Sequence, residues 1–397
     1  MSTFAITAPA GRNLVFHPAR TTLDARHQMF GCWHDMAIIK AARAPYAGWT
    51  VAIEDHVHAL ATVHVLSSAW RRRSGSASSG SHSRMLPRPS GVAHNGDMVG
   101  RFAPSPTGEL HVGNLRTAVA AAAAAAGAGI GFLVRIEDLD RVQYDADHER
   151  RQLEDVAAMG VISDLPPVRQ SDRFDLYRDA IATLAAAGEV YECFCSRREI
   201  RAEIAAAASA PHAHLPDGAY PGTCRDLSAA RRAEFDRQGR VAALRLRTAG
   251  EEYRIDDMVA GTYVGMVDDI VLQRNDGVPA YNLAVVVDDA AQGVTQVVRG
   301  DDLLSSTPRH RHLQERLGLT TPEYWHIPLV VDDEGRRLAK RFGAPSLADL
   351  LAAGHTVESV RHALEQSLGV DESGRVTAMT IPRHTVTCAD LGLTIPD

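Results

Sequence analysis

The chain has 397 residues, of which 45% are apolar and 23% are charged. This is the composition of a soluble globular protein, and the length favours two or three domains. No run of about 18 apolar residues is present to cross a membrane, and the nearly all-alanine run 118–128 is typical of a helix. No secretory signal pattern is present either, so we expect a cytoplasmic protein without a membrane partner.

The charge is unevenly distributed along the chain. Its net value of −7 divides into +5 for residues 1–97, with 10 Lys and Arg against 5 Asp and Glu, and −12 for the remainder, with 32 against 44. A negative body repels phosphates, so any nucleic-acid partner must bind at a local basic patch.

The first 97 residues differ in kind from the rest. They hold three of the four tryptophans and eight of the eighteen histidines, and they end in a Ser-, Gly- and Arg-rich run typical of a linker or disorder. Two interpretations carry equal weight: an unstructured extension, or a mis-assigned translation start with Met98 as the functional one. A small accessory domain is the third alternative.

After residue 97 the pattern is that of an alternating α/β protein. A strand is expected at 98–102, a helix from His111 and a strand at 131–136, a spacing that suits a parallel βαβ unit. Amphipathic helices are expected at 146–159 and 172–187.

The pattern changes at 190–228, a cysteine-rich insertion around one helix that Ser196 and Glu199 open as a capping box. Thr307 and Pro308 are expected as N-cap and N1 of a later helix, and a last helix at about 357–368. Strands are expected in four apolar segments: 241–248, 270–274, 282–289 and 295–300.

The segment 100–114, GRFAPSPTGELHVGN, places a rigid turn with two prolines between a strand and a helix N-terminus. Free N–H groups and the positive dipole end make such a terminus suited to a phosphate chain. His111 and Asn114 share one helix face there, although a histidine at a helix start is more often a cap.

Acidic residues follow the strand at 131–136, beginning with Glu137. They commonly cap the next helix, but ligand sites of parallel sheets also lie where strands end. Further along, the basic segment Arg337–Arg341 lies between Gly335 and Gly343. Such a segment is either a solvated turn or a mobile loop whose Lys340 follows phosphates.

Cys193, Cys195 and Cys224 predict a structural zinc site with three thiolate ligands. Two cysteines one residue apart chelate less readily than a CxxC pair, so three buried free thiols are the alternative. From the residues alone, His212, His214 and Tyr220 compete as the fourth ligand.

The segment 101–114 resembles the HIGH motif of class I aminoacyl-tRNA synthetases in its glutamyl and glutaminyl form, although Asn114 replaces the last histidine. The resemblance implies that His111, Asn114 and Lys340 are catalytic and bind ATP, Lys340 being the second lysine of a KMSKS-type loop in which Ala339 and Arg341 replace both serines. It assigns glutamate to Arg101, Phe102, Ala103, Pro104, Ser105, Glu137, Tyr281 and Arg299. Arginine suits this role because its fork matches a carboxylate.

The pattern C-x-C…Y-x-x-x-C resembles the glutamyl-queuosine tRNA(Asp) synthetases, a truncated branch of this family, and this resemblance selects Tyr220 as the fourth zinc ligand. Only 56 residues follow Arg341, too few for an anticodon-binding domain. The implied architecture is an α/β Rossmann-like catalytic domain at 98–345 with the zinc insertion at 190–228 and a short helical tail at 346–397.

The resemblance implies tRNA-independent activation of L-glutamate by ATP with Mg²⁺, and transfer of the glutamyl group to queuosine in tRNA(Asp), by a monomer with one zinc ion. One alternative is ordinary charging of a tRNA acceptor end. Another, motivated by the altered RLAKR segment, is a weakened paralogue that binds adenylate or RNA as a regulator.

Overall fold

The computed structural model describes residues 98–207, 219–332, 334–338 and 344–393, together with three short strands nearer the N-terminus. The chain divides into two compact units, Met1–Ser83 and Arg84–Asp397. In the first unit, β1 (Phe4–Thr7) pairs antiparallel with β2 (Asn13–Phe16) and with β3 (Thr50–Val51). The expected linker at its end lies outside the described residues.

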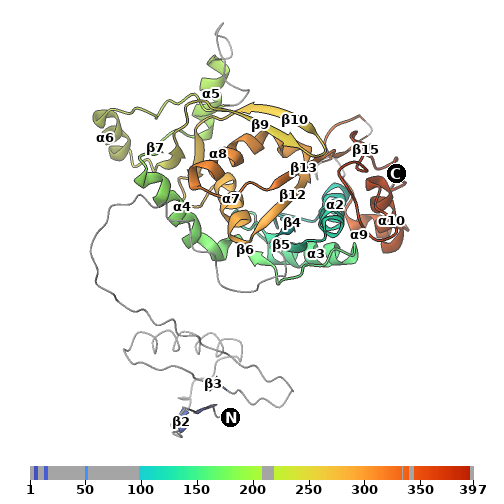
Figure 1. Ribbon diagram of the computed structural model, residues 1–397. Helices are drawn as coiled ribbons and strands as arrows, with labels where there is room; N and C mark the ends of the chain where they lie inside the picture. Colours follow the sequence, from blue (N-terminus) through green and yellow to red (C-terminus); the bar gives the residue numbers. More distant parts are fainter. Residues whose placement is uncertain are drawn as a thin grey trace, which may run out of the picture. The chain divides into compact units, whose positions relative to one another are not determined.

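A parallel five-stranded sheet forms the centre of the second unit (Figure 1), in the order β13-β12-β4-β5-β6. The expected βαβ unit is confirmed, because β4 and β5 pair in parallel and α2 connects them. The strands are β4 (Val99–Phe102), β5 (Gly131–Ile136), β6 (Val168–Arg169), β12 (Val294–Gly300) and β13 (Glu323–Ile327).

Helix α2 (Val112–Ala128) packs close to the sheet because its side chains are small. A Cβ on Gly100 of β4 would lie only 2.9 Å from the Cβ of Ala125, so this close approach needs glycine at that position. Gly129 ends the helix in the left-handed conformation, with φ 67°. The predicted alanine-rich helix is therefore largely buried.

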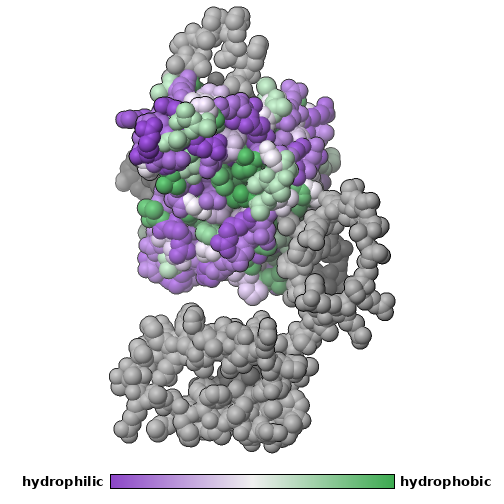
Figure 2. All heavy atoms as spheres, turned by 90° about the vertical axis from the view of Figure 1, so that its left-hand side faces the viewer, coloured by the Kyte–Doolittle hydropathy of each residue, from purple (hydrophilic) through white to green (hydrophobic). Residues whose placement is uncertain are grey.

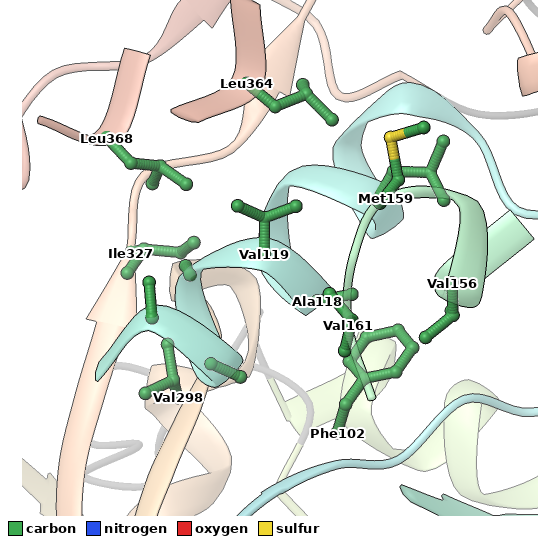
Figure 3. Packing of buried hydrophobic residues seen from close by; sticks show 14 of the residues in the cluster. Phe102, Ala118, Val119, Val156, Met159, Val161, Val298, Ile327, Leu364 and Leu368 are labelled. Carbon is green, nitrogen blue, oxygen red and sulfur yellow. The ribbon is translucent and has the colours of Figure 1, made fainter. Parts of the chain in front are cut away.

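The helix predicted at 357–368 is present as α10 (Val357–Leu368). It packs against α2. Figure 3 shows Val119 of α2 facing Leu364 and Leu368, with Phe102 on the sheet side. The fully buried Arg116 joins the two helices, donating to Ser367 Oγ at 3.0 Å and to the Pro328 carbonyl at 2.8 Å. The described residues after 345 thus share one apolar core with the sheet.

The remaining helices of the sheet region are α3 (Ala146–Ala158), α4 (Phe174–Ala186), α7 (Tyr281–Ala291), α8 (Thr307–Leu317) and α9 (Leu347–Ala352), with 3-10 turns η1 (Gln170–Arg173) and η2 (Asp301–Ser306). A further parallel pair joins β14 (Val330–Val331) to β15 (Val386–Thr387). The predicted insertion 190–228 contains β7 (Val190–Cys193) and α5 (Arg197–Ala207). It is followed by α6 (Ala229–Arg237), β8 (Ala243–Leu246), the hairpin β9 (Glu252–Asp257) and β10 (Gly261–Met266), and β11 (Ile270–Gln273).

Two sequence predictions were wrong. The segment 282–289 is part of helix α7 and not a strand, because a continuous apolar run suits a buried helix as well as a buried strand. Helix α8 begins one residue early, with Ser306 as N-cap and Thr307 already helical. The capping box of Ser196 and Glu199 is confirmed by two reciprocal hydrogen bonds.

None of the helices in the described ranges combines the length and the hydropathy needed to cross a bilayer.

Candidate functional site

The turn from β4 into α2 holds His111 and Asn114 at the positive end of the helix. His111 is the N-cap, and its Nδ1 accepts a hydrogen bond from the Gly113 amide at 3.1 Å. Asn114 Oδ1 accepts one from the His111 amide at 3.2 Å. The two side chains therefore form a capping box, so the capping role and the predicted phosphate role coincide at one helix terminus.

The backbone of the turn is held from α3. Gln152 Nε2 donates to the carbonyls of Ser105 at 3.0 Å and Gly108 at 2.6 Å. Phe102 lies in the apolar core and Pro104 is buried, while Ser105 is exposed and Ala103 half-buried. Of the predicted glutamate residues in this turn, Phe102 thus has only its backbone left for a substrate.

Four buried charged residues meet at the carboxyl ends of β4 and β5. The guanidinium of Arg135 lies 2.7 Å from Asp289 Oδ1 and 3.2 Å from Glu137 Oε1. Arg101 Nε lies 3.4 Å from the same Asp289 oxygen. Arg101 and Glu137 are 4% and 9% exposed, so these two predicted glutamate-binding residues are nearly inaccessible to water.

Arg135 and Asp289 were missed by the sequence analysis. The sequence did contain a signal for them, a charged residue at 135 inside an otherwise apolar strand. Because an unpaired charge is too costly to bury, such a residue predicts a buried partner of opposite charge. The same arginine also faces Asp288, at 3.8 Å. That aspartate accepts hydrogen bonds from side chains of η1 and α4, namely Gln170, Arg173 and Tyr177.

The charges of this cluster depend on one another. Burial raises the pKa of Glu137, against the opposing effect of Arg135 and Arg101. Burial acts in the same direction on Asp289, but the charges of Arg101 and Arg135 outweigh it and lower the pKa of that carboxyl. Arg135 keeps its charge, since three neighbouring carboxylates more than offset its desolvation and raise its pKa.

Tyr281 and Arg299 complete the predicted set. Arg299, at the end of β12, is 4% exposed, whereas Tyr281, at the start of α7, is 38% exposed. The ring of Tyr281 lies 6.0 Å from the ring of His310, which in turn contacts Arg299. The structure therefore brings the four predicted side chains Arg101, Glu137, Tyr281 and Arg299 into one site.

Cys193, Cys195 and Cys224 form a cluster in which the three sulfur atoms lie within 4.8 Å of one another. The Tyr220 hydroxyl lies 3.3 Å from Cys193 Sγ and 3.6 Å from Cys195 Sγ. A hydrogen bond from the Cys195 thiol lowers the pKa of the Cys193 thiol below its ordinary value. Three thiols and a phenol with converging atoms fit a tetrahedral zinc site; the competing His212 and His214 lie outside the described residues.

Lys340, Ala339 and Arg341 also lie outside the described residues, but both ends of their segment are described. Before the segment, Arg337 forms an isolated antiparallel β-bridge with Val331. Its guanidinium lies 2.7 Å from Asp302 Oδ2. After the segment, the Pro345 carbonyl accepts a hydrogen bond from the Val112 amide at 2.9 Å, and Ser346 forms an isolated antiparallel β-bridge with His111. The described residues that follow this segment therefore lie at the N-terminus of α2.

A separate cleft of about 580 Å³ lies among α4, β7 and β8, on the face shown in Figure 2. Its lining includes Tyr191, Arg225, Arg232 and Arg247, and none of the predicted site residues. Hydrophobic residues gather in the middle of this face, and hydrophilic residues surround them.

A parallel sheet with a helix N-terminus and a buried set of opposite charges at its carboxyl edge is the arrangement at which open α/β domains bind ligands. The chain belongs to the class I tRNA synthetases (E and Q), whose catalytic-domain model matches residues 97–363.

Sequence relatives agree with this family, and a solved structure shares the fold. A glutamyl-Q tRNA(Asp) synthetase of Nocardia farcinica is 57% identical over 272 residues, 68% of this chain and 85% of the relative. That of Cutibacterium acnes is 49% identical over 285 residues, 71% of this chain and 78% of the relative. A glutamate tRNA ligase from Elizabethkingia meningosepticum, 23% identical with a TM-score of 0.63, shares the fold over 76% of this chain and 68% of its own.

Proposed function

We propose that the chain activates L-glutamate with ATP, without requiring tRNA, and transfers the glutamyl group to queuosine in the anticodon of tRNA(Asp). The observation that carries the proposal is the buried set of Arg101, Arg299 and Glu137. Two guanidinium groups and one carboxylate complement the two carboxylates and the ammonium of glutamate. Relatives with 57% and 49% identity are named for this activity.

Arg101 is suited to receive a carboxylate. Among the described residues its contacts are long, 3.4 Å to Asp289 Oδ1 and 3.5 Å to the Val298 carbonyl. A buried guanidinium has five N–H donors and is stabilised by further acceptors. Glu137 would take the ammonium of the substrate, and Tyr281, Ser105 and the backbone of 102–104 would complete the glutamate site.

In the first step the glutamate α-carboxylate attacks the α-phosphorus of ATP, a C–O–P linkage forms and pyrophosphate leaves. In the second step queuosine attacks the acyl carbon and AMP leaves. Neither step needs a protein nucleophile, because positioning and charge stabilisation supply the acceleration. His111, Asn114 and Lys340 would serve the phosphates, with Mg²⁺ arriving as part of the ATP substrate.

The four donors Cys193, Cys195, Tyr220 and Cys224 would hold one zinc ion. Bound zinc would tie β7 to the segment before α6 as a structural link. We further propose a cytoplasmic monomer in which residues 1–97 are an extension and residues 98–345 carry the activity.

Glutamate transfer to queuosine-containing tRNA(Asp), queuosine-free tRNA(Asp) and tRNA(Glu) tests the proposal. Transfer to the first RNA alone is expected. Charging of tRNA(Glu) alone would overturn it in favour of acceptor-end chemistry. Glutamate-dependent pyrophosphate exchange tests the first step separately, and its absence in zinc-loaded protein would favour a binding paralogue.

A further inference from the structure

Arg299 is enclosed by four acceptors of the protein. Its Nε donates to His326 Nε2 at 2.9 Å, and its Nη1 lies 3.3 Å from His310 Nδ1. Its Nη2 donates to Thr307 Oγ1 at 3.0 Å and to the Leu303 carbonyl at 3.4 Å. A guanidinium has five N–H groups, so contacts with the described part of the chain occupy four of them and leave one, on Nη1, for a ligand.

The two histidines hold opposite tautomers. A guanidinium has no acceptor, so each ring nitrogen that faces Arg299 must be unprotonated. The proton of His326 therefore lies on Nδ1, 2.6 Å from Asp257 Oδ2. That of His310 lies on Nε2, 3.0 Å from Asn282 Oδ1. Both rings are neutral in this arrangement.

Asp257 is itself fixed by the backbone. Its carboxylate accepts from the amides of Val259 at 3.0 Å, Ala260 at 2.8 Å and His326 at 3.1 Å. The sequence of contacts therefore runs from the end of β9 through β13 to the end of β12. Asp257, His326 and His310 are at most 5% exposed, so water cannot replace any of them without rearrangement.

We propose that His326, oriented by Asp257, and His310, oriented by Asn282, are positioning residues that hold Arg299 with one Nη1–H available to a carboxylate of glutamate. This inference rests on the proposed function, which assigns Arg299 to the substrate. The histidines touch Arg299 and act through it.

Protonation of either ring would place N–H against N–H and repel Arg299. The groups that face His326 are Asp257 on β9, Arg299 on β12, Thr307 on α8 and the stacked Tyr324 on its own strand, and Arg101 adds a more distant charge. His310 faces Arg299, Asn282 and Tyr281, and Arg101, Arg309 and His326 also act on it. Burial is the main cause that lowers the pKa of both rings below 6.5. The positive charge of Arg299 is the next cause that acts in the same direction.

The test is pyrophosphate exchange with the full-length chain, measured as KM for glutamate and KM for ATP. His326→Leu removes donor and acceptor together and is expected to raise KM for glutamate about tenfold or more, with KM for ATP changed less than about twofold. His326→Gln keeps one donor and one acceptor and is expected to restore most of the loss. If the leucine variant fails to fold, Asn282→Ala tests the orientation of His310 without creating a cavity in the core.

His312→Gln is the matched control. His312 lies two residues from His310 on α8, is 3% exposed, and contacts Tyr253 at 3.1 Å instead of Arg299. Its substitution is expected to leave KM for glutamate unchanged, which separates loss of packing from loss of positioning.

The pH profile adds a measurement that a purely structural role would not affect. As the pH falls below about 6.5, kcat/KM for glutamate in the wild-type protein is expected to decrease as the histidines protonate. His326→Gln is expected to flatten part of this fall. A folded leucine or alanine variant with unchanged KM for glutamate, or with equal increases for both substrates, would overturn the inference. Absence of exchange in the wild-type protein would instead overturn the proposed function.

Discussion

The guanidinium of Arg135 lies 2.7 Å from the carboxylate of Asp289, and both side chains are almost completely buried. The pair joins β5 to α7 directly beneath the predicted glutamate site. Through it the positions of Arg101 and Glu137 depend on each other, because Asp289 also contacts Arg101 and Arg135 also contacts Glu137. The charged site therefore forms as one unit.

Arg135→Met should destabilise the protein by about 3–5 kcal/mol, because it leaves buried carboxylates without their shared cation. Chemical denaturation measures this loss. Arg150→Met is the control, since Arg150 pairs with Glu154 on an exposed helix face and such solvent-screened pairs contribute little to stability. Similar losses in both variants would contradict the central role of Arg135.

Glu137→Gln should raise KM for glutamate about 10- to 100-fold, because the amide keeps the shape but loses the charge that attracts the substrate ammonium. KM for ATP should stay nearly constant in the exchange assay. Glu154→Gln, on the exposed face of α3, should change neither constant. A selective rise in KM for ATP would show that Glu137 serves the nucleotide.

Lys340→Ala should lower the rate of adenylate formation about 100-fold while glutamate still binds, because its charge would act on the phosphates as they separate. Lys340→Arg should retain part of the activity. Lys340 is the one lysine in residues 98–397, so acetylation followed by mass spectrometry monitors it directly. ATP should protect it, and equal labelling with and without ATP would remove the assignment.

Metal analysis should find about one zinc ion per chain, bound by the three thiolates and Tyr220. Cys224→Ser should lose the metal and unfold at a lower temperature. Cys388→Ser, outside the cluster, should keep it. Zinc retained by the Cys224→Ser protein would point to other ligands.

Asp155→Asn should stabilise the protein at about pH 8 by about 1–2 kcal/mol. Burial, with smaller contributions from Glu109 and Glu154, raises the pKa of Asp155 from 3.8 to about 6. The folded state therefore favours the protonated carboxyl, and the stability that this form contributes is lost as the pH rises through about 6.

Thermal unfolding of the Asp155→Asn variant at several pH values measures the effect. The advantage of asparagine should shrink as the pH falls toward 4, where Asp155 is protonated in the folded state. Asp179→Asn, on the exposed face of α4, should show little difference at either end of the range. A constant advantage of Asp155→Asn across the range would contradict the assignment.

The sequence by itself determined the local features of this protein. The strand at 131–136, the helix at 357–368 and the capping box of Ser196 and Glu199 all follow from short-range patterns, because turn residues, caps and apolar periodicity act over a few positions. The family signature in 101–114 likewise lies in one continuous segment.

Only the tertiary structure decided which distant residues share the buried charge. Asp289 lies 188 positions from Arg101, and Asp257 lies 69 from His326. Tertiary packing also explains why the strand predicted at 282–289 was wrong. An apolar run can be buried as a strand or as a helix, and packing between the sheet and α8 selects the helix. Long-range pairing of buried charges leaves no periodic pattern along the chain, so the supports of Arg101 and Arg299 appear only when the strands are side by side.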